Sequence, residues 1–174
     1  MEKYELLIEV TKSNLESLLR ILDKAEAHVK EKGIEESTLL TAKLYPDMLD
    51  FTKQIQISSD YGRKDLALLA GKEPVAMEDT ETTLAQLKER ISKTLDVVQT
   101  FTKEDFANAD GEGVKLRWFP EGMHVKGKDF LNQFAISNFL FHVVTAYDIL
   151  RAQGVVIGKA DFIGEMKFEA DSSN

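Results

Sequence analysis

Apolar residues recur at steps of three and four along four long stretches of this chain, a spacing that favours amphipathic helices. The clearest stretch carries Leu84, Leu87, Ile91, Leu95 and Val98. Each such helix has one apolar face that must be buried against its neighbours. The sequence therefore predicts an all-α protein, a four-helix bundle with up-down-down-up or similar topology.

Residues that begin or end helices limit the four stretches. Gly33, Gly71 and Gly154 each follow an apolar repeat and can take the left-handed conformation that closes a helix. Pro46 suits the first turn of a helix because its missing N–H would be unpaired there. We expect helices at residues 2–32, 46–70, 80–101 and 128–153.

Three further features complete the predicted domain. Gly62 lies inside the second helix, where it indicates a close approach of two helices or a slight bend. Residues 114–119 and 124–126 flank a turn-rich spacer, which predicts a small β-hairpin before the last helix. No internal repeat or second domain is found, so we expect one domain over residues 1–174, with a short frayed tail from about 165.

Composition excludes several classes of function. The chain has no Cys, which removes disulfides, thiolate nucleophiles and zinc–thiolate sites and favours a reducing, cytoplasmic location. Its net charge is −8 and its Lys and Arg residues are scattered among the acids, so nucleic acid is not an expected partner. No apolar run approaches the roughly 18 residues needed to cross a bilayer, so we expect no membrane span.

One histidine stands out as a candidate site residue. His142 falls within the almost wholly apolar stretch 134–146, and Asn138 precedes it by one helical turn on the same face. A buried imidazole must be hydrogen-bonded or bound to something. The pair therefore indicates either a small binding site or a satisfied polar network in the core. The glycine loops and histidine motifs of common enzymes are absent.

The segment Asn138-Phe-Leu-Phe-His142, followed by Leu150-Arg151 and Gly154, resembles the last-helix motif of the DinB/YfiT-like superfamily. The resemblance extends over nearly the full length and is strongest to a bacterial branch of unassigned function. It implies a four-helix bundle with a pocket between helices. Many members of the superfamily hold a divalent metal through three histidines, and some transfer low-molecular-weight thiols.

Carried over to this sequence, the resemblance implies a degenerate metal site. His142 matches the second histidine of the last helix, Asn138 takes the place of the first, and Gln56 falls near the position of the ligand from the second helix, with Gln54 one register shift away. Amide oxygens bind transition metals weakly. We therefore expect no tightly held cofactor and at most a weakly bound divalent metal. Tyr147 is expected to line the same pocket.

Three functions follow, and the sequence leaves open whether the protein is an enzyme. The first is a small-molecule pocket floored by Asn138 and His142, with Gln54 or Gln56 opposite. The second is a divalent-metal-dependent thiol transferase that uses His142. The third is a non-catalytic homodimer, in which the apolar last helix and Trp118 form the interface. We expect a homodimer, which is compatible with all three.

Overall fold

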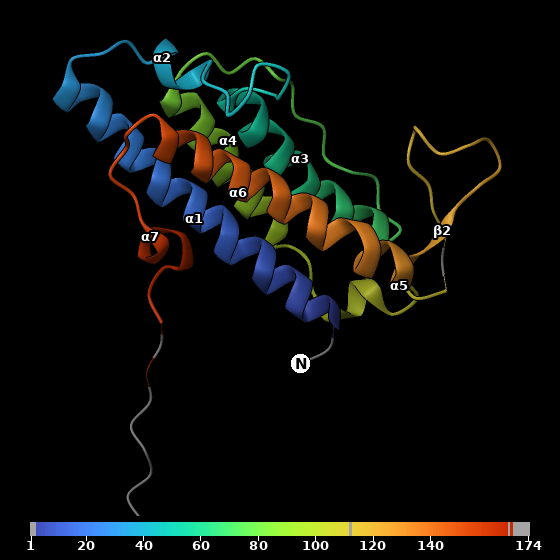
Figure 1. Ribbon diagram of the computed structural model, residues 1–174. Coiled ribbons are helices and arrows are strands. Elements are labelled where there is room, and N and C mark those ends of the chain that lie inside the picture. Colours follow the sequence, from blue (N-terminus) through green and yellow to red (C-terminus); the bar gives the residue numbers. More distant parts are fainter. Residues whose placement is uncertain (1–2, 112, 167, 169–174) are drawn as a thin grey trace, which may run out of the picture.

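A computed structural model describes residues 3–111, 113–166 and 168, and it confirms the predicted all-α bundle (Figure 1). The four long helices lie side by side. Helices α1 and α6 run in one direction and α3 and α4 in the other, with the linker between α3 and α4 running back along the bundle (Figure 1). The topology is therefore up-down-down-up. The four helices are α1 (Lys3–Lys32), α3 (Phe51–Leu69), α4 (Leu84–Val98) and α6 (Ile136–Ala152).

Short elements connect the long helices. Two strands pair antiparallel, with Gly113 opposite Lys126 and Val114 opposite Val125, which confirms the small hairpin at a shorter length than predicted. The last predicted helix is divided by a π-helical turn, η2, just before α6. The short elements are α2 (Ser37–Leu40), the 3-10 turn η1 (Lys103–Phe106), β1 (Gly113–Val114), β2 (Val125–Lys126), α5 (Gly127–Phe130), η2 (Leu131–Ala135) and α7 (Lys159–Ile163).

Two helices begin later than the sequence predicted. Helix α3 begins at Phe51 rather than Pro46, because the Asp50 side chain accepts a hydrogen bond of 2.9 Å from the Lys53 N–H and caps the helix there. Helix α4 begins at Leu84, where Thr83 is the capping residue. In both cases the first turn starts at a side chain that satisfies an otherwise unpaired backbone donor.

Gly62 brings α3 close to its neighbours, as predicted. A Cβ atom at this position would lie 3.3 Å from the Phe139 ring of α6 and 3.3 Å from the Thr11 methyl group of α1. The core around this crossing is formed by fully buried residues of α1 such as Leu15 and Leu18. The close approach fixes the seam between α3 and α6, along which the candidate site lies.

The C-terminal part of the chain returns to the bundle through α7. The Asp161 carbonyl accepts a hydrogen bond of 3.1 Å from the Arg20 Nε–H, and the Asp161 carboxylate pairs with Lys24 at 2.7 Å. Phe162 packs against Tyr147 of α6, as expected for a tail that returns to the core. The frayed tail expected from about 165 falls largely on residues 167 and 169–174, which lie outside the described residues.

Helix α6 keeps part of its apolar surface exposed. Phe141 is 56% exposed and Val144 is 41% exposed. A homodimer that covers these side chains stays a prediction, which light scattering can test. Within the part of the chain that the structure describes, no helix is long and apolar enough to cross a membrane.

Candidate functional site

His142 is held by a residue of the facing helix. Its Nδ1 atom lies 2.7 Å from the Gln54 Oε1 atom of α3, and its ring stacks on Tyr61 with a centroid distance of 5.9 Å. Gln54 is itself buried, and its amide nitrogen donates to the Leu49 carbonyl at 3.4 Å. The imidazole is thus oriented by α3 rather than packed passively in the core.

The Gln54 contact also sets the protonation of the ring. Because the Gln54 amide nitrogen donates to Leu49, its oxygen faces His142, and the proton therefore resides on Nδ1. Burial lowers the pKa of His142 below its ordinary value, so the ring is neutral at pH 7. Among the described residues, Nε2 has no hydrogen-bonding partner, which leaves its lone pair available as an acceptor.

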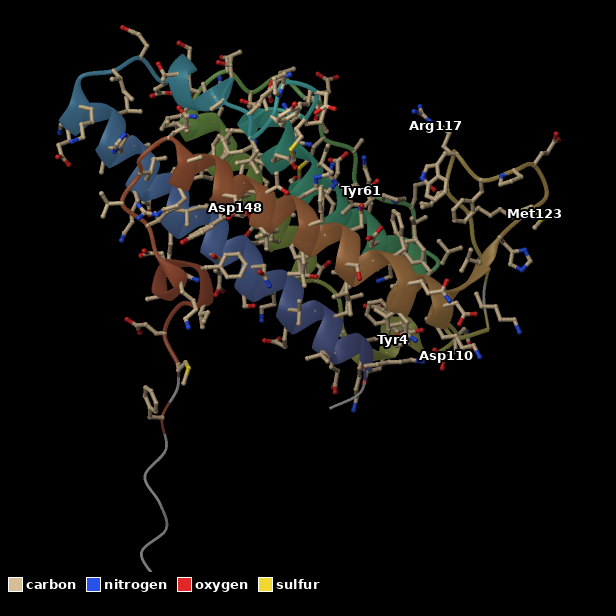
Figure 2. All side chains as sticks on the ribbon, in the orientation of Figure 1. Tyr4, Tyr61, Asp110, Arg117, Met123 and Asp148 are labelled. Atoms are coloured by element: carbon tan, nitrogen blue, oxygen red, sulfur yellow. The ribbon has the colours of Figure 1, made fainter. Side chains whose placement is uncertain are left out.

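A cavity of about 350 Å³ lies beside this imidazole, between α3, α6 and the loop that joins β1 to β2. Figure 2 shows Tyr61 on α3 and Arg117 on the side of the loop nearer that helix. The volume suits a small organic molecule. The lining residues are Ile57, Asp60, Tyr61, Lys64, Leu116, Arg117, Trp118 and His142.

Two polar side chains farther along the same seam lack partners. Asp65 is only 3% exposed, and neither of its carboxyl oxygens has a hydrogen-bonding partner within the described chain. Burial raises the pKa of Asp65 to about 8. The Asn138 Nδ2 atom is likewise buried and unpaired. Burial raises the pKa of Tyr61, and the side-chain amide of Asn138 beside its hydroxyl partly opposes this.

The structure brings together only some of the residues that the sequence predicted for the site. Gln54 meets His142 across the α3–α6 seam and the Asn138 side chain lies beside Tyr61, but of the predicted pocket residues only His142 lines the cavity. Gln56 instead donates a hydrogen bond of 2.8 Å to Glu81 Oε2, in the linker before α4. Two residues along a helix amount to about 200° of rotation, so Gln56 is directed away from His142. Tyr147 packs on Phe162 of α7, with ring centroids 5.8 Å apart, and does not line this cavity.

The predicted metal ligands Gln56, Asn138 and His142 therefore do not converge on one point. Across the described residues, no group of three His, Asp or Glu side chains is arranged to hold a metal ion. Asp60 is the carboxylate that lines the same cavity as His142 and could act as an additional ligand. It is already paired with Lys64, with Arg63 at 2.7 Å and with Arg90 at 2.8 Å. The residues present do not fit a tight transition-metal site.

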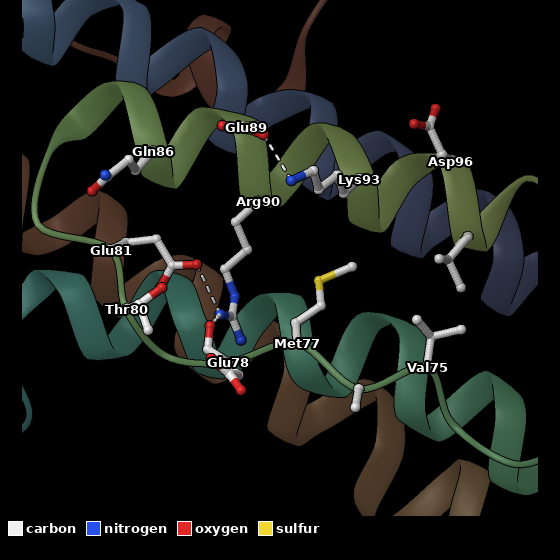
Figure 3. Close-up of a pocket in the computed structure, with 12 residues that line it drawn as sticks. Val75, Met77, Glu78, Thr80, Glu81, Gln86, Glu89, Arg90, Lys93 and Asp96 are labelled. Atoms are coloured by element: carbon white, nitrogen blue, oxygen red, sulfur yellow. Dashed lines mark hydrogen bonds and ion pairs between the residues drawn. The ribbon is translucent and has the colours of Figure 1, made fainter.

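A larger cavity of about 680 Å³ lies between α4 and the linker of residues 70–83 (Figure 3). Figure 3 shows Arg90 reaching from α4 toward the linker, where Glu81 meets it. All five N–H groups of Arg90 have acceptors within 3.1 Å. These acceptors are Ser59 Oγ, the Glu78 carbonyl, and carboxylates of Asp60, Asp79 and Glu81. The guanidinium therefore has no donor left for a ligand.

A second buried arginine completes this network. Arg63 is fully buried and pairs with Asp60. It donates a hydrogen bond of 2.9 Å to the Val75 carbonyl and one of 3.0 Å to Ser59 Oγ. Burial would raise the pKa of Glu81, but hydrogen bonds from Arg90 and Gln56 lower it below its ordinary value. Because the two arginines hold the carbonyls of Val75 and Glu78, their role is to fix the linker on the bundle.

Sequence reasoning did not identify Asp65, Arg63 or Arg90 as buried. One signal was present in the spacing. Asp65 follows Tyr61 by four residues, and Arg90 falls within the apolar repeat of α4 between Leu87 and Ile91. A charged residue in phase with a buried face indicates a partner or a function inside the protein.

Comparisons with known proteins identify the family of this bundle. A family model described as "Domain of unknown function (DUF1993)" matches residues 3–163. A crystal structure of a DinB family member protein from Shewanella denitrificans is 36% identical in sequence, with a TM-score of 0.91, over 96% of this chain and 94% of that one. None of the curated proteins compared with the chain matches it. The chain therefore belongs to the DUF1993 family and is a DinB-like helical bundle, as its last-helix motif predicted.

Proposed function

We propose that this protein binds a small organic molecule in the cavity beside His142, without a tightly held metal. The observation that carries the proposal is the hydrogen bond of 2.7 Å between His142 Nδ1 and Gln54 Oε1. This bond fixes the tautomer and leaves Nε2 unpaired on a residue that lines a cavity of about 350 Å³.

The lining residues define the chemistry of the ligand. A neutral imidazole with a lone pair on Nε2 accepts a hydrogen bond, so the ligand carries a donor such as a hydroxyl or amine group. Tyr61 and Trp118 offer aromatic faces to an apolar or flat part of the molecule. Asp60, Lys64 and Arg117 also line the cavity, and a few directional polar groups among apolar and aromatic walls are typical of small-molecule sites.

Trp118 provides a direct assay because it is the only tryptophan in the chain and lines the cavity. Fragments with hydroxyl or amine groups would be screened by the 15N–1H signal of the Trp118 indole. We expect hits that bind the wild type and a His124→Gln control at least ten times more tightly than His142→Ala. Hits that bind His142→Ala as tightly as the wild type would contradict the proposal.

The competing function is the divalent-metal-dependent transfer of a thiol through His142. The residues of this chain do not fit a three-ligand site, because Gln56 is bonded to Glu81 and Asp60 to basic side chains. Elemental analysis of the purified protein separates the two functions. Near-equimolar zinc or nickel would overturn the metal-free proposal. Equal rates of thiol transfer by wild type and His142→Ala, with metals added, would exclude the transferase.

A further inference from the structure

Polar residues follow one side of α3 from the His142 contact toward the end of the helix. Gln54, Ser58, Tyr61 and Asp65 recur at steps of three and four, so they share one helical face. Gln54 reaches His142 and Tyr61 stacks on it, which shows that this face is directed at α6. Asp65 therefore extends the polar line one turn beyond the cavity.

The end of this line contains three unpaired polar atoms on two residues. Both carboxyl oxygens of Asp65 and the Nδ2 atom of Asn138 are buried without a hydrogen-bonding partner in the described structure. Native proteins pair nearly all such atoms, so each exception requires an explanation. Tyr61 links these atoms to the cavity, because it lines the cavity and its hydroxyl lies beside the Asn138 amide. The π-turn η2 precedes Asn138 in the chain, and π-turns occur often at functional sites.

We infer that Asp65 and Asn138 form the inner end of the ligand site, and that the ligand presents a primary amine to the Asp65 carboxylate. The inference rests on the proposed function and names the ligand class. An ammonium group donates the hydrogen bonds that two orphaned carboxyl oxygens require, and it supplies the charge that a buried carboxylate lacks. Asn138 Nδ2 donates to an oxygen of the same ligand. Neither Asp65 nor Asn138 lines the cavity, and Asp65 is closed to solvent, so the ligand reaches them only when the Tyr61 side chain turns aside.

Binding of the amine should change the protonation of Asp65. With a pKa of about 8, Asp65 is mostly neutral at pH 7 before the ligand arrives. An ammonium ion paired with it favours the carboxylate, so binding transfers the Asp65 proton to the buffer, about 0.9 per site at pH 7. Lys64 is the charged neighbour that acts on Asp65, and Tyr61 of this face stacks on His142, the titratable group of α6 that meets it. Thr11 and Leu15, the α1 residues that approach α3 at Gly62, are uncharged.

Two probes of the same shape test the inference. These are 2-phenylethylamine, which carries an ammonium group, and 2-phenylethanol, which carries a hydroxyl group in its place. Titration calorimetry and the Trp118 indole signal would follow binding to wild type, Asp65→Asn and an Asp148→Asn control, whose carboxyl is on the exposed side of α6. We expect the amine to bind Asp65→Asn at least ten times more weakly than the wild type and the control. The alcohol should bind all three alike.

Proton release by the wild type provides a second readout that needs no variant. Titrations of the amine in phosphate and in Tris at pH 7 should differ in heat by about 0.9 of the difference in buffer ionisation enthalpy. Equal affinity of the amine for wild type and Asp65→Asn, no binding of the amine, or no proton release would overturn the inference. If any of these results is found but the alcohol binds wild type more tightly than His142→Ala, the inference fails and the proposed pocket stands. If neither probe changes the Trp118 signal, the proposed pocket fails as well.

Discussion

Replacing Asp65 by Asn should stabilise the protein at neutral pH. The Asp65 carboxyl has a pKa of about 8 in the folded state against 3.8 for the ordinary group. At pH 7 the unfolded chain is ionised at this position while the folded chain retains the proton. The interval of roughly 3 pH units, at about 1.4 kcal/mol each, amounts to about 4 kcal/mol of stability that the wild type forgoes. Asn keeps the shape and does not ionise.

The sign of the effect follows from the direction of the shift. An acid whose pKa is raised by folding favours the folded state fully below pH 3.8, and this contribution is lost as pH rises until the carboxyl ionises near pH 8 in the folded state too. The difference between Asp65→Asn and wild type should therefore be near zero at pH 4, grow steadily with pH, and level off above pH 8. Other titrating groups cancel because both proteins contain them.

Urea unfolding at one-unit steps from pH 4 to pH 9 would measure this difference, with Asp148→Asn as the control. The exposed Asp148 should give a difference within about 0.5 kcal/mol at every pH. A difference for Asp65→Asn that does not change with pH, or an Asp65→Asn protein less stable than wild type at pH 7, would refute the reasoning. Either result would mean that Asp65 is ionised and satisfied in the folded protein.

Three further predictions concern the site and the framework around it. The His142 ring should titrate below 6.5 with its proton on Nδ1, as read from 15N shifts; a midpoint above 6.5 would contradict the burial argument. Arg90→Ala should cost about 3–5 kcal/mol in urea unfolding because it removes a buried guanidinium and leaves the largely buried Glu81 carboxylate without a basic partner, whereas Lys93→Ala, which removes an exposed pair, should cost under about 1 kcal/mol. Gly127→Ala should lower stability by about 1–3 kcal/mol, since the new Cβ would meet a backbone oxygen at 1.9 Å, while Gly158→Ala, with open space, should be nearly neutral; equal thermal midpoints would refute this contrast.

The bundle was predictable because its helices are specified by local spacing. The repeat of Leu84, Leu87 and Ile91 requires a buried face whatever the rest of the chain does. Helix starts were less predictable, because Pro46 and Asp50 are both good signals and only the capping contact decides between them. Gly62 indicated a close approach or a slight bend, and the structure shows the close approach, at which an added Cβ would be tight against Phe139 and Thr11.

The candidate site was predictable in part. The apolar context of His142 marked it as unusual, but the facing residue depends on the rotation of α3, which the sequence does not fix to within two residues. The pocket prediction therefore left Gln54 and Gln56 open, and the metal prediction favoured Gln56, whereas the structure places Gln54 at the imidazole. The spacing places Arg90 in phase with the apolar face of α4, but the partners that satisfy Arg63 and Arg90 depend on the path of the linker across α3 and α4, and the sequence pattern does not reveal that path.

The π-turn η2 has a consequence for how the last helix is built. It holds one residue more than a regular turn, so the segments on its two sides are offset by about 100° from the phase of an uninterrupted helix. Phe130 can thus anchor the helix in the hydrophobic interior while Asn138 and His142 still meet α3. Deleting a single residue from this turn would rotate either Phe130 or the pair Asn138 and His142 toward water. The π-turn therefore allows the imidazole to face its cavity while the start of the helix stays well packed.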